Sequence, residues 1–269
     1  MSKTAIITGA NKGIGLAVAK DLITKNYQVI LACRDTAKGK MAEEFLGSNA
    51  IFLELDLSKP SSINQFVDQI NSDYSELDVL YNNAGLIYRD FELTEEGYES
   101  MIAVNYFGSF RLALMLLENL HRSSGRIVQV TSFSMYLART FNLSGLHSKD
   151  SFSPSSRYNF TNLLRSMFAI ELENKLKKTS ISVSAAHPGV TKSRQSRPYE
   201  VKKIKKSFYT YFSTNIKTGI APIIRAIEDE NITADLVYAP KLIGIYGQPA
   251  LMRYNKLVYN QELLSLIHI

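Results

Sequence analysis

The sequence has few of the features that mark secreted, membrane-spanning or multidomain proteins. Cys33 is its one cysteine among 269 residues, so no intramolecular disulfide can form and a reducing, cytoplasmic location is expected. No apolar window is long enough to span a bilayer, and the N-terminal apolar segment is too short for a signal peptide. No proline-, glycine- or serine-rich linker, internal repeat or low-complexity segment interrupts the chain. These absences predict one soluble domain.

Acidic residues and metal-ligand patterns are also scarce. The net charge of +6 suits a polyanionic ligand, and a dinucleotide meets that condition as readily as nucleic acid does. No second histidine or carboxylate stands at ligand spacing from His187, so no metal site is expected and His187 is interpreted as structural. His121 and His147 are expected at the surface. With 45% hydrophobic residues the chain can bury a full core.

What the chain does have is a glycine-rich turn near its start. The segment Thr8–Gly15 follows the apolar run Thr4–Ile7 and precedes an amphipathic stretch. Its glycines leave room for a tight turn, for the approach of a pyrophosphate and for packing of the helix on its strand, while the helix N-terminus offers free N–H groups. The residues predicted to bind a cofactor here are Gly9, Asn11, Lys12, Gly13, Ile14 and Gly15.

Strand and helix patterns alternate along the chain. The expected strands are Thr4–Thr8, Gln28–Cys33, Ala50–Leu55, Leu77–Tyr81, Arg126–Thr131, Ser180–Ala186 and Leu236–Tyr238. The expected helices include Ile14–Thr24, Ser61–Tyr74, Glu95–Leu120 and Arg157–Lys177. This alternation predicts an α/β fold with a doubly wound, mostly parallel sheet covered by helices on both faces. Ligands of such sheets bind outside the carboxyl ends of the strands, where the polar motifs fall.

Seven short motifs occur in order along nearly the whole chain. They are Thr8–Gly15, Leu31–Asp35, Asp56–Leu57, Asn82–Gly85, Val104–Asn105, Val130–Ser132 and His187–Val190. On these motifs the chain resembles the short-chain dehydrogenases/reductases, and specifically the branch of the retinol dehydrogenases and the WW-domain oxidoreductase. The resemblance implies a single Rossmann domain over residues 1–269 with a seven-stranded parallel sheet.

The resemblance also implies which residues hold the dinucleotide. Those assigned to its adenosine half are Asp56, Leu57, Asn83, Ala84 and Gly85. Those assigned to its nicotinamide half are Pro188, Gly189, Val190 and Thr191. Among them, Asp56 is implied to bond the adenine amino group, and Val190 with Thr191 to meet the nicotinamide carboxamide.

The end of the second expected strand bears on the choice of cofactor. A dehydrogenase that selects NAD usually ends this strand in a carboxylate that binds the ribose 2′-hydroxyl. Here Arg34 follows Cys33 and can pair with a 2′-phosphate, and Lys12 adds a second cation. These residues predict NADP(H) rather than NAD. The alternative is that both are ordinary solvated basic residues.

The resemblance assigns the chemistry to a hydroxyl pair. Ser132 matches the serine that bonds the substrate carbonyl oxygen, and Tyr158 matches the tyrosine whose phenol exchanges a proton as hydride moves. Tyr158 lies 26 residues after Ser132, which is typical of the retinol dehydrogenase branch. The inserted segment, around 135–156, is expected to form a loop over the substrate.

The chain departs from the family four residues after this tyrosine. There the family has a lysine that grips the nicotinamide ribose and activates the phenol, whereas this chain has Asn162. Arg165 lies roughly 10 Å from Tyr158 along a helix axis, so it is expected to be too far to replace that charge. Arg157 is expected to point to another face. Asn105, which in the family holds a water bonded to the lysine, is retained.

The loss of the lysine affects the two reaction directions unequally. Alcohol oxidation needs the phenolate, which is scarce without a nearby cation, whereas carbonyl reduction needs the neutral phenol. The sequence therefore predicts an NADP(H)-dependent oxidoreductase that reduces a carbonyl, or oxidises the matching alcohol, of a small apolar substrate. Two alternatives stay open: a non-redox enzyme on this scaffold (a dehydratase, epimerase or cyclase), and a cofactor-binding protein with little turnover.

A basic and aromatic stretch follows the last motif. In this fold its position, around 191–215, is that of a substrate flap, and its aromatic residues are Phe208, Tyr209, Tyr211 and Phe212. They are expected to line an apolar substrate pocket. A solvated helix face is an equal alternative, and a membrane or nucleic-acid surface a lesser one. Relatives often form dimers or tetramers through the helices matching Glu95–Leu120 and Arg157–Lys177, so a homo-oligomer is expected.

Overall fold

A computed structural model describes residues 2–88, 90–138, 148–191, 215–231, 233–242 and 244–260. Most of the expected substrate flap, including its four aromatic residues, lies outside the described residues. So do the middle of the inserted loop, with His147, and the C-terminal residues from 261 onward. The predictions made for these segments stay predictions.

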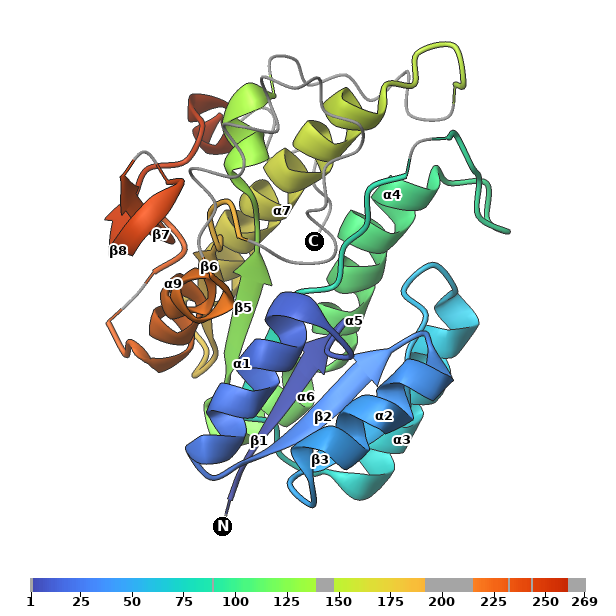
Figure 1. The fold of residues 1–269 in the computed structure, drawn as a ribbon, viewed down its shortest axis with the longest axis vertical. Coiled ribbons are helices and arrows are strands. Elements are labelled where there is room, and N and C mark those ends of the chain that lie inside the picture. The colour runs from blue at the N-terminus through green and yellow to red at the C-terminus, as the bar shows by residue number, and fades with distance from the viewer. Residues whose placement is uncertain are drawn as a thin grey trace.

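The strands form a single mixed sheet (Figure 1). They are β1 (Lys3–Thr8), β2 (Tyr27–Cys33), β3 (Ala50–Glu54), β4 (Val79–Asn82), β5 (Arg126–Val130), β6 (Ser182–Ala186), β7 (Val237–Leu242) and β8 (Tyr246–Met252). Their order in the sheet is β3-β2-β1-β4-β5-β6-β7-β8, and the pairs up to β7 are parallel. The order reverses beside β1, between β2 and β4, which is the topological switch point where such sheets bind ligands. The predicted doubly wound α/β fold is confirmed.

The sheet has eight strands, so the prediction of seven is wrong by one. The additional strand, β8, pairs antiparallel with β7 at the sheet edge. Its sequence carries Gly247, with φ +111°, and Pro249. Edge strands tolerate proline because one side of the strand needs no backbone donor, but a short segment with glycine and proline does not read as a strand.

The helical elements connect these strands. They are α1 (Gly13–Thr24), α2 (Thr36–Leu46), α3 (Pro60–Asp73), α4 (Ser100–Ile102), the π-helix η1 (Ala103–Gly108), α5 (Ser109–Met115), α6 (Leu117–Ser123), the 3₁₀-helices η2 (Phe133–Leu137) and η3 (Lys256–Tyr259), α7 (Pro154–Leu176) and α9 (Ile216–Glu228). In the part of the chain described, no single helix is long and apolar enough to cross a membrane. One bent pair, Ser100–Met115 with Leu117–Ser123 at 54°, passes the same test on length and composition alone.

The helix expected from Glu95 begins later and is interrupted. Glu99 caps α4 by accepting hydrogen bonds from the backbone N–H groups of Met101 (2.9 Å) and Ile102 (3.2 Å). The residues before it form a turn at Gly97 and an isolated bridge between Leu93 and Glu99. The apolar pattern in this region therefore reflects burial rather than one continuous helix.

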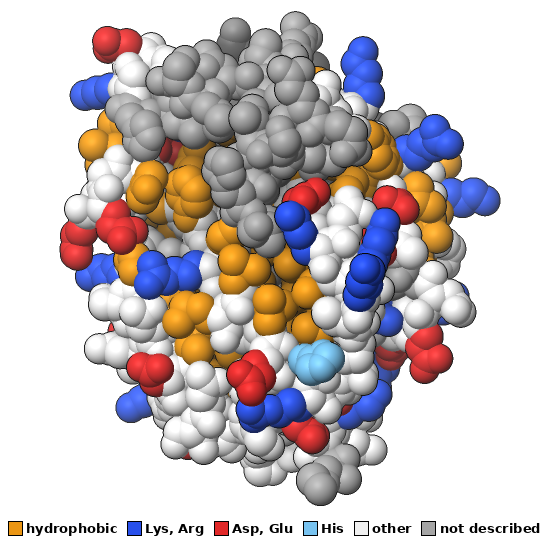
Figure 2. Space-filling model, turned by 180° about the vertical axis from the view of Figure 1, so that it is seen from behind, with side chains coloured by type: hydrophobic (Ala, Val, Ile, Leu, Met, Phe, Trp, Pro, Cys, Tyr) orange, Lys and Arg blue, Asp and Glu red, His pale blue; other side chains and the backbone are white. Residues whose placement is uncertain are grey.

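The sheet separates two hydrophobic cores. One lies beneath α3, α5 and α7, and the other beneath α1 and α9. Figure 2, viewed from behind Figure 1, shows hydrophobic side chains gathered in a band across the surface, with basic and acidic side chains interspersed around it. The described part of this face thus carries mixed charge rather than the basic stripe typical of nucleic-acid binding.

Candidate active site

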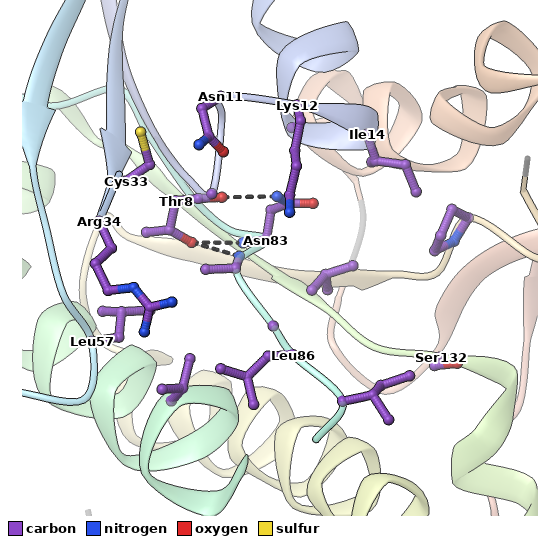
Figure 3. Close-up of a pocket in the computed structure, with 18 of the residues that line it drawn as sticks. Thr8, Asn11, Lys12, Ile14, Cys33, Arg34, Leu57, Asn83, Leu86 and Ser132 are labelled. Carbon is purple, nitrogen blue, oxygen red and sulfur yellow. Dashed lines mark hydrogen bonds between the residues drawn. The ribbon is translucent and has the colours of Figure 1, made fainter. Parts of the chain in front are cut away.

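A cavity of about 680 Å³ opens at the carboxyl ends of the central strands (Figure 3). Of the residues assigned to catalysis and cofactor binding, all but two line it: Gly9, Asn11, Lys12, Ile14, Gly15, Arg34, Asp56, Leu57, Asn83, Ala84, Gly85, Ser132, Tyr158, Asn162, Pro188, Gly189, Val190 and Thr191. Gly13 and Asn105 lie behind the lining. The volume suits a ligand of drug or cofactor size.

The glycine turn has no room for side chains. Gly9 has φ +68°, and a Cβ built on it would lie 3.1 Å from Cα of Ala84. A Cβ on Gly15 would lie 2.7 Å from both Nδ2 of Asn83 and the carbonyl oxygen of Gly9. Gly13, with φ +57°, shapes the turn without lining the cavity. The turn is therefore packed tightly against the segment after β4, and Gly9 and Gly15 also line the cavity.

Thr8 fastens the glycine turn to the segment that follows β4. Its Oγ1 accepts hydrogen bonds from the backbone N–H groups of Asn83 (3.0 Å) and Ala84 (2.8 Å). In return, Nδ2 of Asn83 donates to the Thr8 carbonyl at 2.8 Å. Sequence reasoning did not single out Thr8, although its place at the end of β1, directly before the turn, is the signal that could have found it.

The N-terminus of α1 is suited to an anion. Lys12 occupies the N-cap position, but its side chain makes no capping hydrogen bond. The first N–H groups of a helix have no partner within the helix, and they carry its positive dipole end. Lys12 and Ile14 line the cavity beside these groups. The arrangement matches the helix-terminus sites that bind phosphate.

Arg34 lies at the other end of the cavity, at the end of β2. Its guanidinium donates a hydrogen bond to the Tyr88 hydroxyl, and this contact raises the pKa of Arg34. The neighbouring Asp35 caps α2 by accepting from the backbone N–H of Lys38 (3.0 Å) and pairs with the Lys38 ammonium. The Lys38 contacts lower the pKa of Asp35. The Asp35 carboxylate, next to Arg34, is thus engaged with α2. Tyr88 is a hydrogen-bond partner of Arg34 that the sequence did not reveal.

Asp56 has a fixed orientation. Its Oδ1 accepts hydrogen bonds from the backbone N–H of Ser58 (3.0 Å) and from the Ser58 hydroxyl (2.6 Å). Ser62 in α3 accepts from the Asp56 backbone N–H at 2.9 Å. These contacts hold the Asp56 carboxylate at the cavity wall.

Ser132 and Tyr158 face the same cavity from different elements. Ser132 follows β5 and caps η2, with its Oγ accepting from the backbone N–H of Ser134 at 3.2 Å. Tyr158 lies near the start of α7, and both residues line the cavity. Thr131 holds the two elements together, because its Oγ1 donates to the Asn162 carbonyl at 3.1 Å and lies 2.9 Å from Oγ of Ser166.

Asn162 lines the cavity one helical turn after Tyr158. It is buried, with 1% of its surface exposed. Its Nδ2 donates to the Tyr158 carbonyl at 2.9 Å, and its Oδ1 has no hydrogen-bond partner among the described residues. The amide orientation is unambiguous, since a carbonyl oxygen can only accept.

Asn105 lies behind the cavity wall within the π-helix η1. Its side chain makes a reciprocal pair with the backbone of Leu86, accepting at 2.8 Å and donating at 3.0 Å, and it also donates to Oγ1 of Thr161 at 3.2 Å. Its backbone carbonyl accepts from Nε of Arg165 at 2.5 Å. Asn105 therefore organises the wall without lining it. Single π-turns of this kind recur at functional sites.

Arg165 lines the cavity together with Tyr158, although it lies about two helical turns further along α7. Its Nη2 donates to the Ala84 carbonyl, and a Cβ on Gly85 would lie 3.0 Å from Nη1. Burial lowers the pKa of Arg165 to about 10, and the nearby phenol of Tyr158 acts in the opposite direction.

Two other sequence predictions are resolved outside the cavity. His187 is completely buried beside the last motif, and its Nδ1 accepts from the backbone N–H of Gly189 at 3.2 Å. Arg157 faces away from the cavity and pairs with the buried Glu99 at 3.8 Å. The buried, hydrogen-bonded His187 fits its structural interpretation, and Arg157 lies on another face of α7, as expected. His121 is exposed, as expected.

Comparison with known families and sequences gives consistent results. The profile of the short chain dehydrogenase family matches residues 3–203. Retinol dehydrogenase 11 of Mus musculus is 34% identical over 222 residues, covering 80% of this chain and 69% of its own length. Retinol dehydrogenase 14 of Homo sapiens is 30% identical over 268 residues, covering 91% of this chain and 77% of its own length.

Solved structures share the fold. An uncharacterized protein from Mycobacterium paratuberculosis superposes with a TM-score of 0.78 at 27% identity, covering 98% of this chain and 89% of its own. A 3-ketoacyl-(acyl-carrier-protein) reductase from Brucella melitensis, complexed with NADH, gives a TM-score of 0.70 at 21% identity, with 87% and 94% of the two chains covered. An NADPH-bound carbonyl reductase from chicken liver gives 0.67 at 18% identity, with 88% and 96% covered.

Proposed function

The chain belongs to the short-chain dehydrogenase family and is an oxidoreductase, and from this premise we propose an NADP(H)-dependent enzyme for a small apolar carbonyl compound or its matching alcohol. The observation that supports the proposal is a single cavity lined by Ser132, Tyr158 and residues of the glycine turn. The family fixes the class of reaction. The cofactor preference and the substrate class are inferred from this chain's own residues.

The cavity fits a nicotinamide dinucleotide, which when bound supplies or accepts the hydride. Gly9, Asn11, Lys12 and Gly15 line the cavity, and the glycine-rich turn is suited to the close approach of a pyrophosphate. The uncapped N-terminus of α1 offers further donors. Asp56 lines the cavity with its Oδ1 held by Ser58, and we assign it to the adenine.

Three features support NADP(H) over NAD. Arg34 stands at the end of β2, where a guanidinium can make charge-assisted hydrogen bonds to a 2′-phosphate. Lys12 adds a second positive charge on the same rim of the cavity. Asp35, the carboxylate at this corner, is engaged as the cap of α2 and in an ion pair with Lys38. The surroundings of Arg34 and Lys12 therefore favour an additional negative charge on the ligand, such as a 2′-phosphate.

The chemistry follows from the two hydroxyl groups. In reduction, the Ser132 hydroxyl donates a hydrogen bond to the substrate carbonyl oxygen, and the Tyr158 phenol gives that oxygen its proton as the carbon accepts hydride. In oxidation the proton moves from the alcohol to the Tyr158 phenolate. Both residues line the cavity beside Asn162 and Thr191.

The walls near these hydroxyl groups favour an apolar substrate. Leu86, Ile87 and Val104 line the cavity, with Val130 and Val190. Apolar lining with a few convergent polar groups is typical of sites for small organic ligands. The names of the retinol dehydrogenases, which are among the similar proteins, point to the same class of substrate.

The test is turnover on a panel of apolar aldehydes and ketones with NADPH, followed at the cofactor absorbance. We expect the wild type to consume NADPH with at least one of them, and Tyr158→Phe to abolish both reduction and the reverse oxidation while NADPH still binds. Lys178→Ala, an exposed change at the far end of α7, is the control. A substrate converted without NADPH consumption would indicate a non-redox enzyme. Binding without any turnover would indicate a cofactor-binding protein.

A further inference from the structure

We propose that Arg165 and Asn162 together take the place of the family's single lysine, with Arg165 supplying the positive charge beside Tyr158 and Asn162 accepting a hydrogen bond from the nicotinamide ribose. This inference rests on the proposed function, because it concerns a bound nicotinamide dinucleotide. It divides between two residues the roles of charge and ribose contact that the family gives to one side chain.

The buried side-chain amide of Asn162 supports the proposed hydrogen bond to the nicotinamide ribose. Its NH₂ group is committed to the Tyr158 carbonyl, so Oδ1 is left as an acceptor. That oxygen is buried without a partner among the described residues, and the side chain lines the cavity. An unsatisfied buried acceptor is costly unless a ligand or water completes it. A ribose hydroxyl is a donor of the required kind.

The guanidinium of Arg165 supplies the proposed positive charge. It is held by two backbone carbonyls, those of Asn105 and Ala84, and forms no ion pair with a carboxylate of the described residues. Carbonyl dipoles orient the group without neutralising it, so its field acts on the cavity. Tyr158 and Tyr81 are the groups with which the charge interacts.

The position of the charge also explains the role of Asn105. In the family, the asparagine at this position holds a water that bonds the lysine, and here its backbone carbonyl binds Arg165 directly at 2.5 Å. The π-helix presents this carbonyl to α7. Even with its pKa lowered to about 10, the Arg165 guanidinium is protonated at neutral pH, so it supplies charge and hydrogen bonds there rather than a proton.

Other ionisable groups around this end of α7 are engaged elsewhere or neutral. From the elements packed on α7 they are Tyr81 (β4), Tyr106 (η1), Tyr136 (η2), Glu99 with Arg157, and His187 after β6. Tyr136 donates to the Arg253 carbonyl, and burial raises the pKa of both Tyr81 and Tyr106. Arg165 is thus the cation to test.

The first experiment measures tyrosine ionisation in the free protein. The difference between the ultraviolet titrations of a protein and of its Tyr158→Phe partner isolates this phenol from the other tyrosines. Arg165→Gln should move its midpoint to higher pH, because a nearby positive charge favours the phenolate. Asn162→Lys added to Arg165→Gln should move it back, since it returns a cation one helical turn from the phenol. The pH limb of alcohol oxidation should follow the same shifts.

The second experiment measures cofactor binding. Asn162→Leu removes the acceptor at similar size and should weaken NADPH and NADH alike by about two- to tenfold, the effect of one hydrogen bond. Adenosine 2′,5′-bisphosphate, which lacks the nicotinamide ribose, should bind this variant as it binds the wild type. If Arg165→Gln does not fold, the double variant and Asn162→Leu carry the test.

The results separate this inference from the proposed function. An unmoved midpoint in folded Arg165→Gln, or a double variant that folds without lowering the midpoint to within a unit of wild type, would overturn the charge role. Equal weakening of the bisphosphate and the dinucleotides by Asn162→Leu would overturn the ribose contact. If both responses appear but no carbonyl is reduced, the inference holds and the proposed redox function fails.

Discussion

At the scale of single residues, the buried imidazole of His187 couples the stability of the fold to pH. Burial lowers the pKa of His187 to about 4, from an ordinary value of about 6.5. Its Nδ1 accepts from the Gly189 backbone, and its Nε2 has no partner among the described residues. The neutral ring is therefore the form that the fold requires.

The sign of the pH effect follows from this lowered value. Between pH 6.5 and 4 the unfolded chain binds a proton that the folded chain does not, so stability falls as the pH falls through this window. At pH 5 the loss is about 2 kcal/mol relative to pH 7. His187→Asn keeps an acceptor for Gly189 but cannot titrate. Urea unfolding at pH 7 and pH 5 should show a smaller loss for this variant than for wild type, and equal losses would assign the acid sensitivity to other groups.

The residues of the site differ in how far the sequence could predict them. The glycine turn was predictable because its demands are local: Gly9 and Gly15 have no space for a Cβ wherever the rest of the chain lies. The position of Arg165 was not predictable, because it depends on the backbone carbonyls of Ala84 and Asn105, which come from segments distant in the sequence. The same holds for Tyr88, whose contact with Arg34 spans the rim of the cavity.

At the scale of elements, the approach of η1 to the segment after β3 depends on Gly108. A Cβ on this residue would lie 2.3 Å from the Leu57 carbonyl oxygen and 2.7 Å from its Cβ. The carbonyl is backbone and cannot turn away, so the helix itself must shift. Leu57 lines the cavity and Asn105 belongs to η1, so a shift would reach the site from two sides.

We expect Gly108→Ala to cost about 1 to 3 kcal/mol of stability, as overpacking does, and to weaken NADPH binding. Gly39→Ala in α2 is the control variant, because it also adds a methyl group at a crowded glycine but against a side chain rather than backbone. Its Cβ would also come too close, at 2.2 Å from the Phe52 ring, but that ring is a half-buried side chain rather than backbone. Chemical denaturation and NADPH titration measure both effects. A Gly108→Ala protein as stable as wild type would mean that η1 adjusts without strain.

Element boundaries were predictable where the signal lies in one segment. The parallel strands were found because they are continuous apolar runs, as strands buried on both faces must be. The helix expected from Glu95 was misplaced, since the cap that starts it uses the side chain of Glu99, and Glu99 is itself buried beside Arg157 from α7. The antiparallel β8 depends on pairing with β7 rather than on its own composition.

At the scale of the whole molecule, the sheet holds the two ends of one cavity apart. Arg34 and Asp56 lie at the end beyond β2 and β3, and Ser132 and Tyr158 at the end beyond β5 and α7. The glycine turn lies between them, at the switch point of the strand order. Because the two ends use different elements, ligand fragments that reach only one end can test each separately.

Adenosine 2′,5′-bisphosphate and adenosine 5′-monophosphate differ only in the 2′-phosphate, and both lack the nicotinamide half. The charge-assisted contact of Arg34 with that phosphate should make the bisphosphate bind about tenfold more tightly. At a concentration of 100 times its Kd the bisphosphate stabilises the folded chain by about 2.7 kcal/mol, whereas the monophosphate at the same concentration, binding tenfold more weakly, contributes about half of that. The Tm should therefore rise about twice as far with the bisphosphate.

Arg34→Ala should remove this difference between the two ligands. Asn162→Leu should preserve it, because Asn162 lies at the other end of the cavity. Equal shifts for the two fragments in the wild type would exclude Arg34 as the residue that selects NADP(H).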